Sequence, residues 1–208
     1  MNKYVFFLLV IFSTLSNANQ TAVSDTGDIV ILKSDGTWSY QSNENIKEFA
    51  EIPLNKKEFN KGKKASFNLK SQVTNSQFSF NPKLWSFEKE VGDSHEYSFT
   101  LKGEDLYGMV ITEGMELPIE TLASAAMINF RSVAPAAKVI HKEYRVVNGN
   151  KVLYMETLAP ISGVEFVYKG YYFSNESGST QYLVYTSNGL AGKYKNETSE
   201  FLNGFSVQ

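Results

Sequence analysis

Residues 138–158 read KVIHKEYRVVNGNKVLYMETL and carry the clearest indication of the fold. Asn148-Gly149 separates two runs rich in β-branched and aromatic residues, and Asn-Gly suits a tight hairpin turn because both residues tolerate positive φ. The same alternation continues through 163–174, GVEFVYKGYYFS, and after further turn residues through 180–187, TQYLVYTS. Four strands joined by short turns predict an antiparallel meander.

The segment before the meander predicts an amphipathic helix over residues 117–131. Pro118 suits the first helical turn, and Pro135 follows the expected end. The apolar residues recur at helical spacing, at Ile119, Leu122, Ala123, Ala126, Met127 and Phe130. One apolar stripe of this kind faces a sheet. Packing explains the stripe fully, because it carries no His and no paired carboxylates.

Shorter elements flank these two regions. Short strands fit residues 65–69, 77–80, 96–101 and 107–112. A second helix fits residues 196–203, where Asn196 can cap the start and Gly204 can end it. The order of elements predicts an α+β fold in which helices cover an antiparallel sheet. This main domain is expected to span residues 65–208.

The N-terminus predicts a secretory signal over residues 1–18. Lys3 provides the charged start, Tyr4–Phe12 form an apolar run, and small residues precede the expected cleavage point. The apolar run is shorter than the roughly 20 residues that span a bilayer. An N-terminal membrane anchor is the alternative. The signal predicts a protein of the bacterial periplasm or the extracellular space, with no integral membrane segment once the signal is removed.

Residues 19–41 predict a β-hairpin segment. Ile29–Leu32 form one strand, Asp35-Gly36 supply the turn, and Thr37–Tyr40 favour the return strand. An isolated two-stranded hairpin is only marginally stable in water. We therefore expect this hairpin to dock on the main domain, to pair with another chain, or to belong to a small independent unit.

Residues 42–64 differ in composition from the rest of the chain. Lysines are frequent, apolar residues are few, and the periodicity is poor. This composition predicts a Lys-rich, solvated linker. A basic patch for an anionic lipid or polymer is the alternative, although interspersed glutamates dilute its charge.

The composition excludes several classes of protein. The chain has 208 residues, no Cys, two His and a net charge of −2. Without cysteine it is not a disulfide scaffold, a zinc ribbon, a thiol enzyme or an iron–sulfur protein. The slightly acidic charge argues against binding of nucleic acid. Phosphate-binding and nucleophile-elbow motifs are absent from the sequence. We therefore predict a protein that is not an enzyme and has neither cofactor nor metal; a hydrolase using His141 or Glu113 is a weaker alternative.

Aromatic residues are the one compositional excess, at 14% of the chain. Tyr168 and Tyr172 share one face of their predicted strand and Tyr171 lies on the other. These side chains either pack in the core or form a binding platform. Arg131, just after the apolar helix stripe, either binds an anionic group or neutralises the helix C-terminus. With Trp38 of the hairpin, these residues form the set of candidate binding residues.

Two segments resemble PsbP-like proteins. Residues 78–85, FSFNPKLW, resemble the strand–Pro–Trp opening of that family, and 201–207, FLNGFSV, resemble its closing segment. Together with the order of elements, the resemblance covers about residues 65–208. It implies an α/β/α sandwich built on an antiparallel sheet, in a family that is not generally enzymatic. The hairpin and the Lys-rich segment precede the region of resemblance, and no functional residue is transferred.

These observations predict a secreted, non-catalytic binding or assembly module. The hairpin would contact a protein partner by strand addition. The alternative is a carrier of a small ligand or lipid, with a pocket between helix 117–131 and the sheet. The expected partner is thus a protein or a small ligand.

Overall fold

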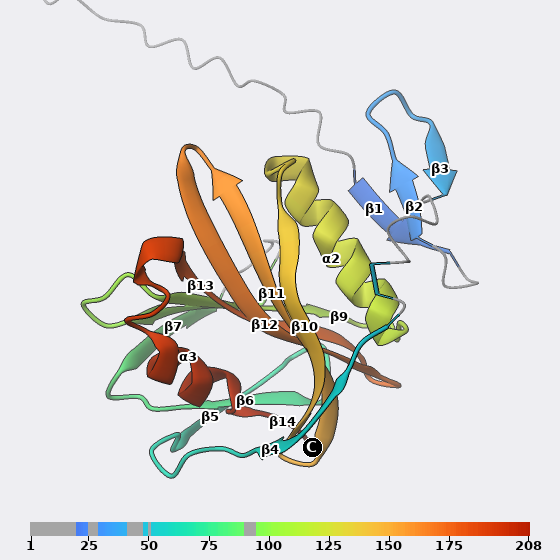
Figure 1. The fold of residues 1–208 in the computed structure, drawn as a ribbon. Coiled ribbons are helices and arrows are strands. Elements are labelled where there is room, and N and C mark those ends of the chain that lie inside the picture. Colours follow the sequence, from blue (N-terminus) through green and yellow to red (C-terminus); the bar gives the residue numbers. More distant parts are fainter. Residues whose placement is uncertain (1–19, 25–28, 41–47, 50, 90–94) are drawn as a thin grey trace, which may run out of the picture.

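The computed structural model describes residues 20–24, 29–40, 48–49, 51–89 and 95–208. The predicted signal peptide lies outside the described residues. Eight strands form one large sheet in the order β4-β10-β11-β12-β13-β9-β8-β7 (Figure 1). Their bounds are β4 (Leu54–Phe59), β7 (Trp85–Lys89), β8 (Tyr97–Leu101), β9 (Tyr107–Glu113), β10 (Lys138–Val147), β11 (Asn150–Ile161), β12 (Val164–Asn175) and β13 (Gly178–Ser187). Neighbouring strands are antiparallel, except that β4 runs parallel to β10.

The predicted meander is confirmed as β10 to β13. Asn148 and Gly149 form the first turn with φ of 46° and 82°, which is the left-handed region that the Asn-Gly pair was expected to occupy. A similar turn, with positive φ at Ser162 and Gly163, joins β11 to β12, and these two strands pair from Ile161↔Val164 to Leu153↔Tyr172. The long strands of the meander form the centre of the sheet.

Helix α2 (Ile119–Val133) covers one face of the sheet (Figure 1). Its buried residues Leu122, Ala126 and Met127 pack in one core with Leu153 and Met155 of β11. The helix begins two residues later than predicted because Pro118 lies outside it as the N-cap, with an extended ψ of 134°. The predicted apolar stripe therefore faces the sheet as expected.

The opposite face is covered by helix α3 (Lys195–Leu202) and by a small antiparallel sheet. The small sheet has the order β14-β6-β5, with β5 (Phe67–Lys70), β6 (Ser76–Phe80) and β14 (Phe205–Val207). Phe201 of α3 lies at the centre of this core, stacked on Trp85 with 4.1 Å between ring centroids and tilted against Tyr182 at 4.7 Å. The α+β class is thus confirmed. The second face differs from a purely helical layer, because strands share the covering with α3.

The N-terminal strands form a third sheet, β1-β2-β3. Strand β1 (Gln20–Val23) pairs with β2 (Ile29–Leu32), which pairs with β3 (Trp38–Tyr40). The Asp35 carboxylate accepts hydrogen bonds from the backbone N–H and the hydroxyl of Thr37 and so closes the turn. The predicted hairpin is present with one additional strand, and β1 lies beside α2 (Figure 1).

The linker prediction for residues 42–64 is wrong over β4. This strand pairs with β10, and Tyr144 donates its backbone N–H to the carbonyl of Pro53. Phe49, in the same predicted linker, is only 3% exposed. An edge strand has a neighbour on one side and exposes most of its side chains, so its polar composition resembles that of a loop.

No helix among the described residues has the length and apolarity needed to cross a membrane.

Candidate functional site

A groove of about 560 Å³ runs between α2 and the neighbouring part of the sheet. One wall is the C-terminal half of α2, with Ala126, Phe130 and Val133. The floor is formed by β9, β13 and β12, with Met109, Ile111, Gln181, Leu183 and Tyr168. We call this feature the α2 groove. It is open to solvent, and Val133 at its rim is 67% exposed.

The local periodicities of sequence explain the lining. Met109, Ile111 and Glu113 alternate along β9, so their side chains point to the same face of the sheet. Gln181 and Leu183 do the same on β13, and Gln181 is the direct cross-strand partner of Ile111. Helix α2 packs on β11 and β12 and leaves this part of the face open.

Gln181 is the unusual residue of the groove. Its side chain lies on an otherwise apolar floor and the residue is only 7% exposed. None of the hydrogen bonds among the described residues uses its carboxamide. Buried polar side chains in folded proteins almost always have a hydrogen-bond partner, because an unsatisfied group costs about 1–3 kcal/mol. The groove therefore contains a donor and an acceptor that the described chain does not use.

A row of aromatic rings borders the groove. The Tyr168 ring lies between Phe130 of α2, at 4.7 Å, and Tyr185 of β13, at 5.0 Å between centroids. Tyr107 of β9 extends the row, stacked on Tyr185 at 5.6 Å. Burial, and then the neighbouring Tyr185, raise the pKa of the Tyr168 hydroxyl above its ordinary value. The Tyr168 hydroxyl therefore stays protonated at neutral pH, and the side chain lines the groove as an uncharged ring.

The structure separates the predicted binding residues from one another. Tyr168 lines the α2 groove. Tyr171 and Tyr172 are 1% and 2% exposed, because the sheet is covered on both faces where they lie, so neither ring offers a surface to a ligand. The Arg131 guanidinium is held by the Glu48 carboxylate at 3.0 Å and by the backbone oxygen of Ala137 at 3.2 Å.

Trp38 lies apart from the groove, on the hairpin. It is 59% exposed and makes an edge-to-face contact with Tyr40, with ring centroids 5.4 Å apart. Gln181 was not among the predicted residues. The signal that could have identified it is a polar side chain in register with Leu183 and Tyr185 on the apolar face of a buried strand.

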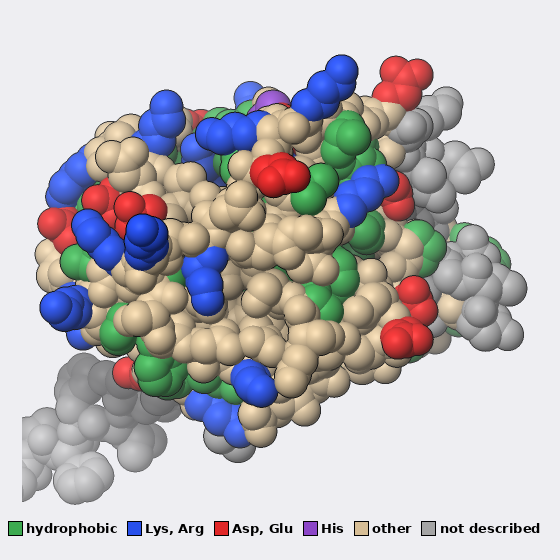
Figure 2. Space-filling model, turned by 90° about the horizontal axis from the view of Figure 1, so that it is seen from below, with side chains coloured by type: hydrophobic (Ala, Val, Ile, Leu, Met, Phe, Trp, Pro, Cys, Tyr) green, Lys and Arg blue, Asp and Glu red, His purple; other side chains and the backbone are tan. Residues whose placement is uncertain are grey.

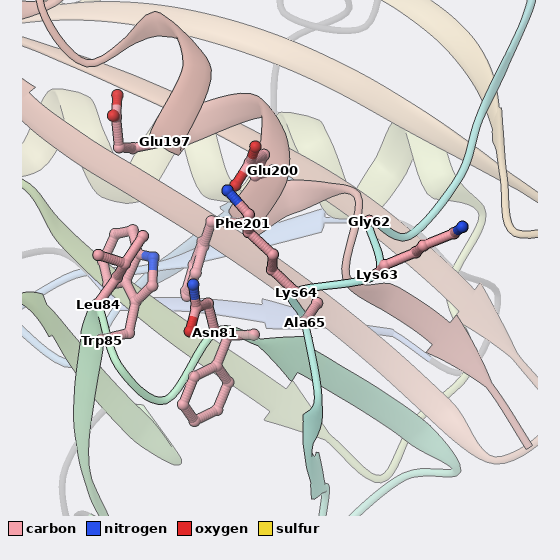
Figure 3. A pocket seen from close by; sticks show the side chains of 11 residues that line it. Gly62, Lys63, Lys64, Ala65, Asn81, Leu84, Trp85, Glu197, Glu200 and Phe201 are labelled. Atoms are coloured by element: carbon pink, nitrogen blue, oxygen red, sulfur yellow. The ribbon is translucent and has the colours of Figure 1, made fainter.

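A second, smaller pocket lies on the other side of the sheet, against α3 (Figure 3). Figure 2 shows the molecule from below; there, basic and acidic side chains intermingle and hydrophobic side chains form small separate patches. Among the described residues, this face therefore has neither a broad apolar patch nor a patch of uniform charge. The concave sites are better candidates for binding than this face.

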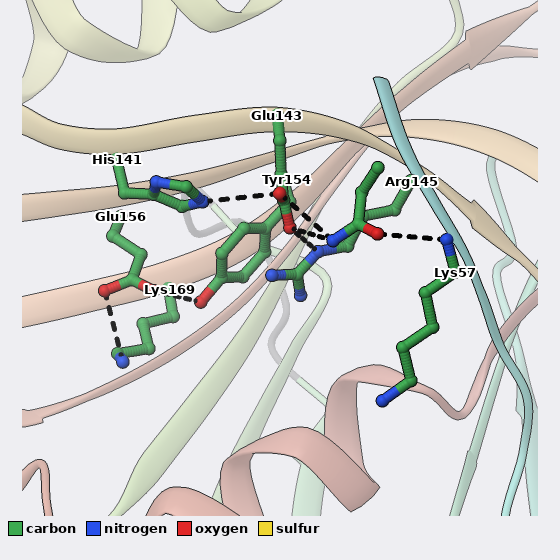
Figure 4. Close-up of polar contacts among 8 residues, drawn as sticks. Lys57, His141, Glu143, Arg145, Tyr154, Glu156 and Lys169 are labelled. Carbon is green, nitrogen blue, oxygen red and sulfur yellow. Dashed lines mark hydrogen bonds and ion pairs between the residues drawn. The ribbon is translucent and has the colours of Figure 1, made fainter. Parts of the chain in front are cut away.

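A polar network joins β4 to β10 and β11 (Figure 4). The Glu143 carboxylate accepts hydrogen bonds from the Asn55 amide at 3.1 Å and from Nε of Arg145 at 2.5 Å, and Nε2 of His141 lies 3.6 Å away. The Arg145 guanidinium stacks on the Tyr154 ring at 3.4 Å. Burial opposes ionisation of Glu143, but the hydrogen bonds from Asn55 and Arg145 outweigh it and lower its pKa.

The partners in this network satisfy one another. The Tyr154 hydroxyl donates to Glu156 at 2.6 Å, and Lys169 forms an ion pair with the same carboxylate at 3.2 Å. Within this network, the hydrogen bond from Asn55 to Glu143 attaches edge strand β4 to β10. His141 is part of this network as a neighbour of the Glu143 carboxylate.

Comparison with known proteins gives a result at the level of fold. No protein family and no curated protein matches the sequence. The solution structure of cyanobacterial PsbP (CyanoP) from Synechocystis sp. PCC 6803 is similar, with a TM-score of 0.52 and 16% identity, over 71% of this chain and 95% of that chain. LpqN of Mycobacterium tuberculosis, involved in cell envelope biogenesis, has a TM-score of 0.46 and 6% identity, over 68% and 90% of the two chains, which is too low to support an argument. The predicted resemblance is thus confirmed in three dimensions: this chain has a PsbP-like fold.

Proposed function

We propose that this protein is a secreted, non-catalytic binding module that holds an apolar segment of a protein partner in the α2 groove. The observation that carries the proposal is the buried, unpaired carboxamide of Gln181 on the floor of an open apolar groove. Secretion rests on the sequence of residues 1–18, and the non-catalytic role rests on the absence of catalytic motifs from the sequence.

The chemistry of the groove favours a peptide. A carboxamide offers N–H donors and a carbonyl acceptor, and a peptide group offers the complementary pair. Apolar side chains of the same segment would pack on Phe130, Val133 and Leu183. The charged residue in the lining is Glu113, so the groove repels an anionic group and tolerates a neutral amide.

The openness of the groove also favours a macromolecular partner. Sites for small ligands usually bury 70–90% or more of the ligand, which requires enclosure. The α2 groove leaves one side to solvent, and exposed Val133 continues its apolar surface outwards. A partner that covers the rim would complete the burial of Gln181.

The second candidate function is that of a carrier for a small ligand or lipid. The groove volume of about 560 Å³ falls within the range of ligand pockets, about 300–1,000 Å³. The groove also lies between helix and sheet, where the sequence predicts a carrier pocket. Because Glu113 disfavours an anion, the ligand would be a neutral amphiphile such as a fatty amide.

The hairpin offers the partner a second contact. Strand β3 pairs with β2 on one side and is at the edge of its sheet, and it exposes Trp38 and Tyr40 at 59% each. A partner strand would add at this edge. Deletion of residues 19–41 would weaken partner binding without abolishing it, and unchanged binding would remove the hairpin from the proposal.

The test uses short random peptides displayed on phage and selected against the full chain. The expected result is enrichment of apolar peptides whose binding falls by at least about tenfold in Val133→Glu and Gln181→Leu. Lys89→Glu, at an exposed residue of strand β7, is the control and should leave binding unchanged. Selected peptides that bind Val133→Glu and Gln181→Leu as tightly as the parent protein would contradict the proposal.

The carrier candidate is tested separately by titrating dodecanamide into the same proteins, followed by native mass spectrometry. If dodecanamide binds saturably at 1:1, if Val133→Glu abolishes this binding, and if the selection enriches no peptide, the protein is a carrier and does not bind a peptide partner in the groove.

A further inference from the structure

A pocket of about 220 Å³ lies against α3, on the face of the sheet opposite the α2 groove. Three separate segments form it: residues 62–65 before β5, the turn between β6 and β7, and α3. Its apolar lining consists of Ala65, Phe80, Leu84, Trp85 and Phe201. We call it the α3 pocket. Neither the fold comparison nor the proposed function accounts for it.

Trp85 supplies the first observation that points to a ligand. The residue is 4% exposed and its ring stacks on Phe201 at 4.1 Å. No hydrogen bond among the described residues uses the indole N–H, although a buried Trp N–H usually has an acceptor. Figure 3 shows the ring nitrogen on the side of the indole that faces the other lining residues. The wall of the pocket therefore carries an unused donor.

The charges at the rim supply a second, independent observation. Lys63 and Lys64 lie on the segment before β5, and Glu197 and Glu200 lie three residues apart on α3. Lys64 extends toward Glu200 and Lys63 points away (Figure 3). No ion pair links the two basic residues to these glutamates in the described chain. The rim of the pocket thus carries both basic and acidic side chains around an apolar floor.

We infer that the α3 pocket binds a small zwitterion with an apolar body, the chemical class of the apolar amino acids. A carboxylate of the ligand accepts the hydrogen bond of Trp85 and faces Lys64, and an ammonium group faces Glu200. The apolar body packs on Leu84 and Phe201. The volume of about 220 Å³ lies below the range of about 300–1,000 Å³ that suits drug-sized ligands, so the ligand is small.

The experiment uses the full chain with Trp38→Phe, which leaves Trp85 as the single tryptophan. L-Leucine is titrated while the indole N–H resonance of Trp85 and its fluorescence are recorded. The expected result is a saturable shift of the indole resonance with a Kd in the range of about 1 μM to 1 mM. Absence of a saturable shift at about 10 mM would overturn the inference and leave the indole bonded to water alone.

Two further comparisons test the zwitterion. Lys64→Gln and Glu200→Gln should each raise the Kd by about tenfold, since each removes one charge that the ligand pairs with, while Lys89→Gln on β7 should leave it unchanged. 4-Methylpentanoate, which lacks the ammonium, and 3-methylbutylamine, which lacks the carboxylate, should bind more weakly than leucine. Equal binding of either analogue would overturn the assignment of a zwitterion.

Discussion

Gln181 and Tyr172 are direct cross-strand neighbours whose polar groups are both buried without a hydrogen bond among the described residues. Their side chains lie on the α2 face, in or beside the floor of the α2 groove. Burial alone raises the pKa of the Tyr172 hydroxyl, so this group stays neutral. Two adjacent unsatisfied groups reduce the stability of the free protein and favour a bound state in which Gln181 is paired.

The first prediction concerns the cost of the unpaired amide. Gln181→Leu should raise the free energy of unfolding by about 1–3 kcal/mol, because it replaces an unsatisfied polar group with an apolar one of similar size. Gln181→Glu should lower it, because it buries a carboxylate. Urea denaturation of the three proteins measures both changes. A loss of stability in Gln181→Leu would show that the amide has a partner in the free protein.

Tyr168 should stabilise the protein through its ring and not through its hydroxyl. Tyr168→Ala loses the ring contacts with Phe130 and Tyr185. The free energy of unfolding should therefore fall by about 1–3 kcal/mol, the sum for two aromatic pairs. Tyr168→Phe keeps the ring and should change stability by less than about 0.5 kcal/mol. Equal effects of the two substitutions, in thermal or urea unfolding, would contradict this account.

Two glycines should differ strongly in how much stability the same substitution costs. A Cβ at Gly204 would lie 1.7 Å from the backbone oxygen of Ser79, because the end of α3 approaches β6 closely. Gly204→Ala should therefore cost about 3 kcal/mol or more. A Cβ at Gly189 meets no atom within 4 Å, and Gly189→Ala should change stability by less than about 0.5 kcal/mol. The urea midpoints of unfolding of the two variants measure this difference. If Gly204→Ala were as stable as the parent, the backbones of α3 and β6 could not approach each other this closely.

Glu143 should make stability depend on pH in the acid range. Its pKa is lowered in the folded protein, so the ionised carboxylate stabilises the fold above the unfolded pKa of about 4.3, and this contribution is lost as the pH falls through the folded pKa. At pH 7, Glu143→Gln should lower the free energy of unfolding by about 1.5–3 kcal/mol, the range for hydrogen bonds to a charged group.

The difference between the parent and Glu143→Gln should narrow as the pH is lowered below about 4.3. Glu88→Gln, at an exposed residue of β7, is the control and should follow the parent at every pH. A difference that stays constant from neutral to acid pH would show that the charge of Glu143 does not contribute.

The sequence predicts the elements that bury a regular apolar pattern. The meander and α2 have this pattern because they form the core, and Asn148-Gly149 also defines a turn by its backbone preference alone. The periodicity of the sequence does not predict strands β1, β4, β7 and β14. Strand β4 is a polar edge strand and β14 has three residues, so neither carries enough periodicity to distinguish it from a loop.

The candidate site was predictable in place but not in detail. The pocket between helix 117–131 and the sheet was expected, and Tyr168 lines it. The sequence includes Tyr171 and Tyr172 among the candidate binding residues because alternation shows which residues share a face but not whether that face is covered. The α3 pocket was not expected, since it joins residues 62–65 to Glu200 through tertiary contacts that no local pattern encodes.

The pairing of β14 with β6 has a kinetic consequence. Phe205 pairs with Phe78, and β4 similarly pairs with residues of β10 far along the chain. Such non-local pairings form slowly, because the entropy cost of closing the long intervening loop comes before the contacts that compensate for it. The small sheet cannot close until Phe205–Val207 has been synthesised. If the proposed secretion takes the chain across a membrane unfolded, this late closure delays completion of the core until export is over.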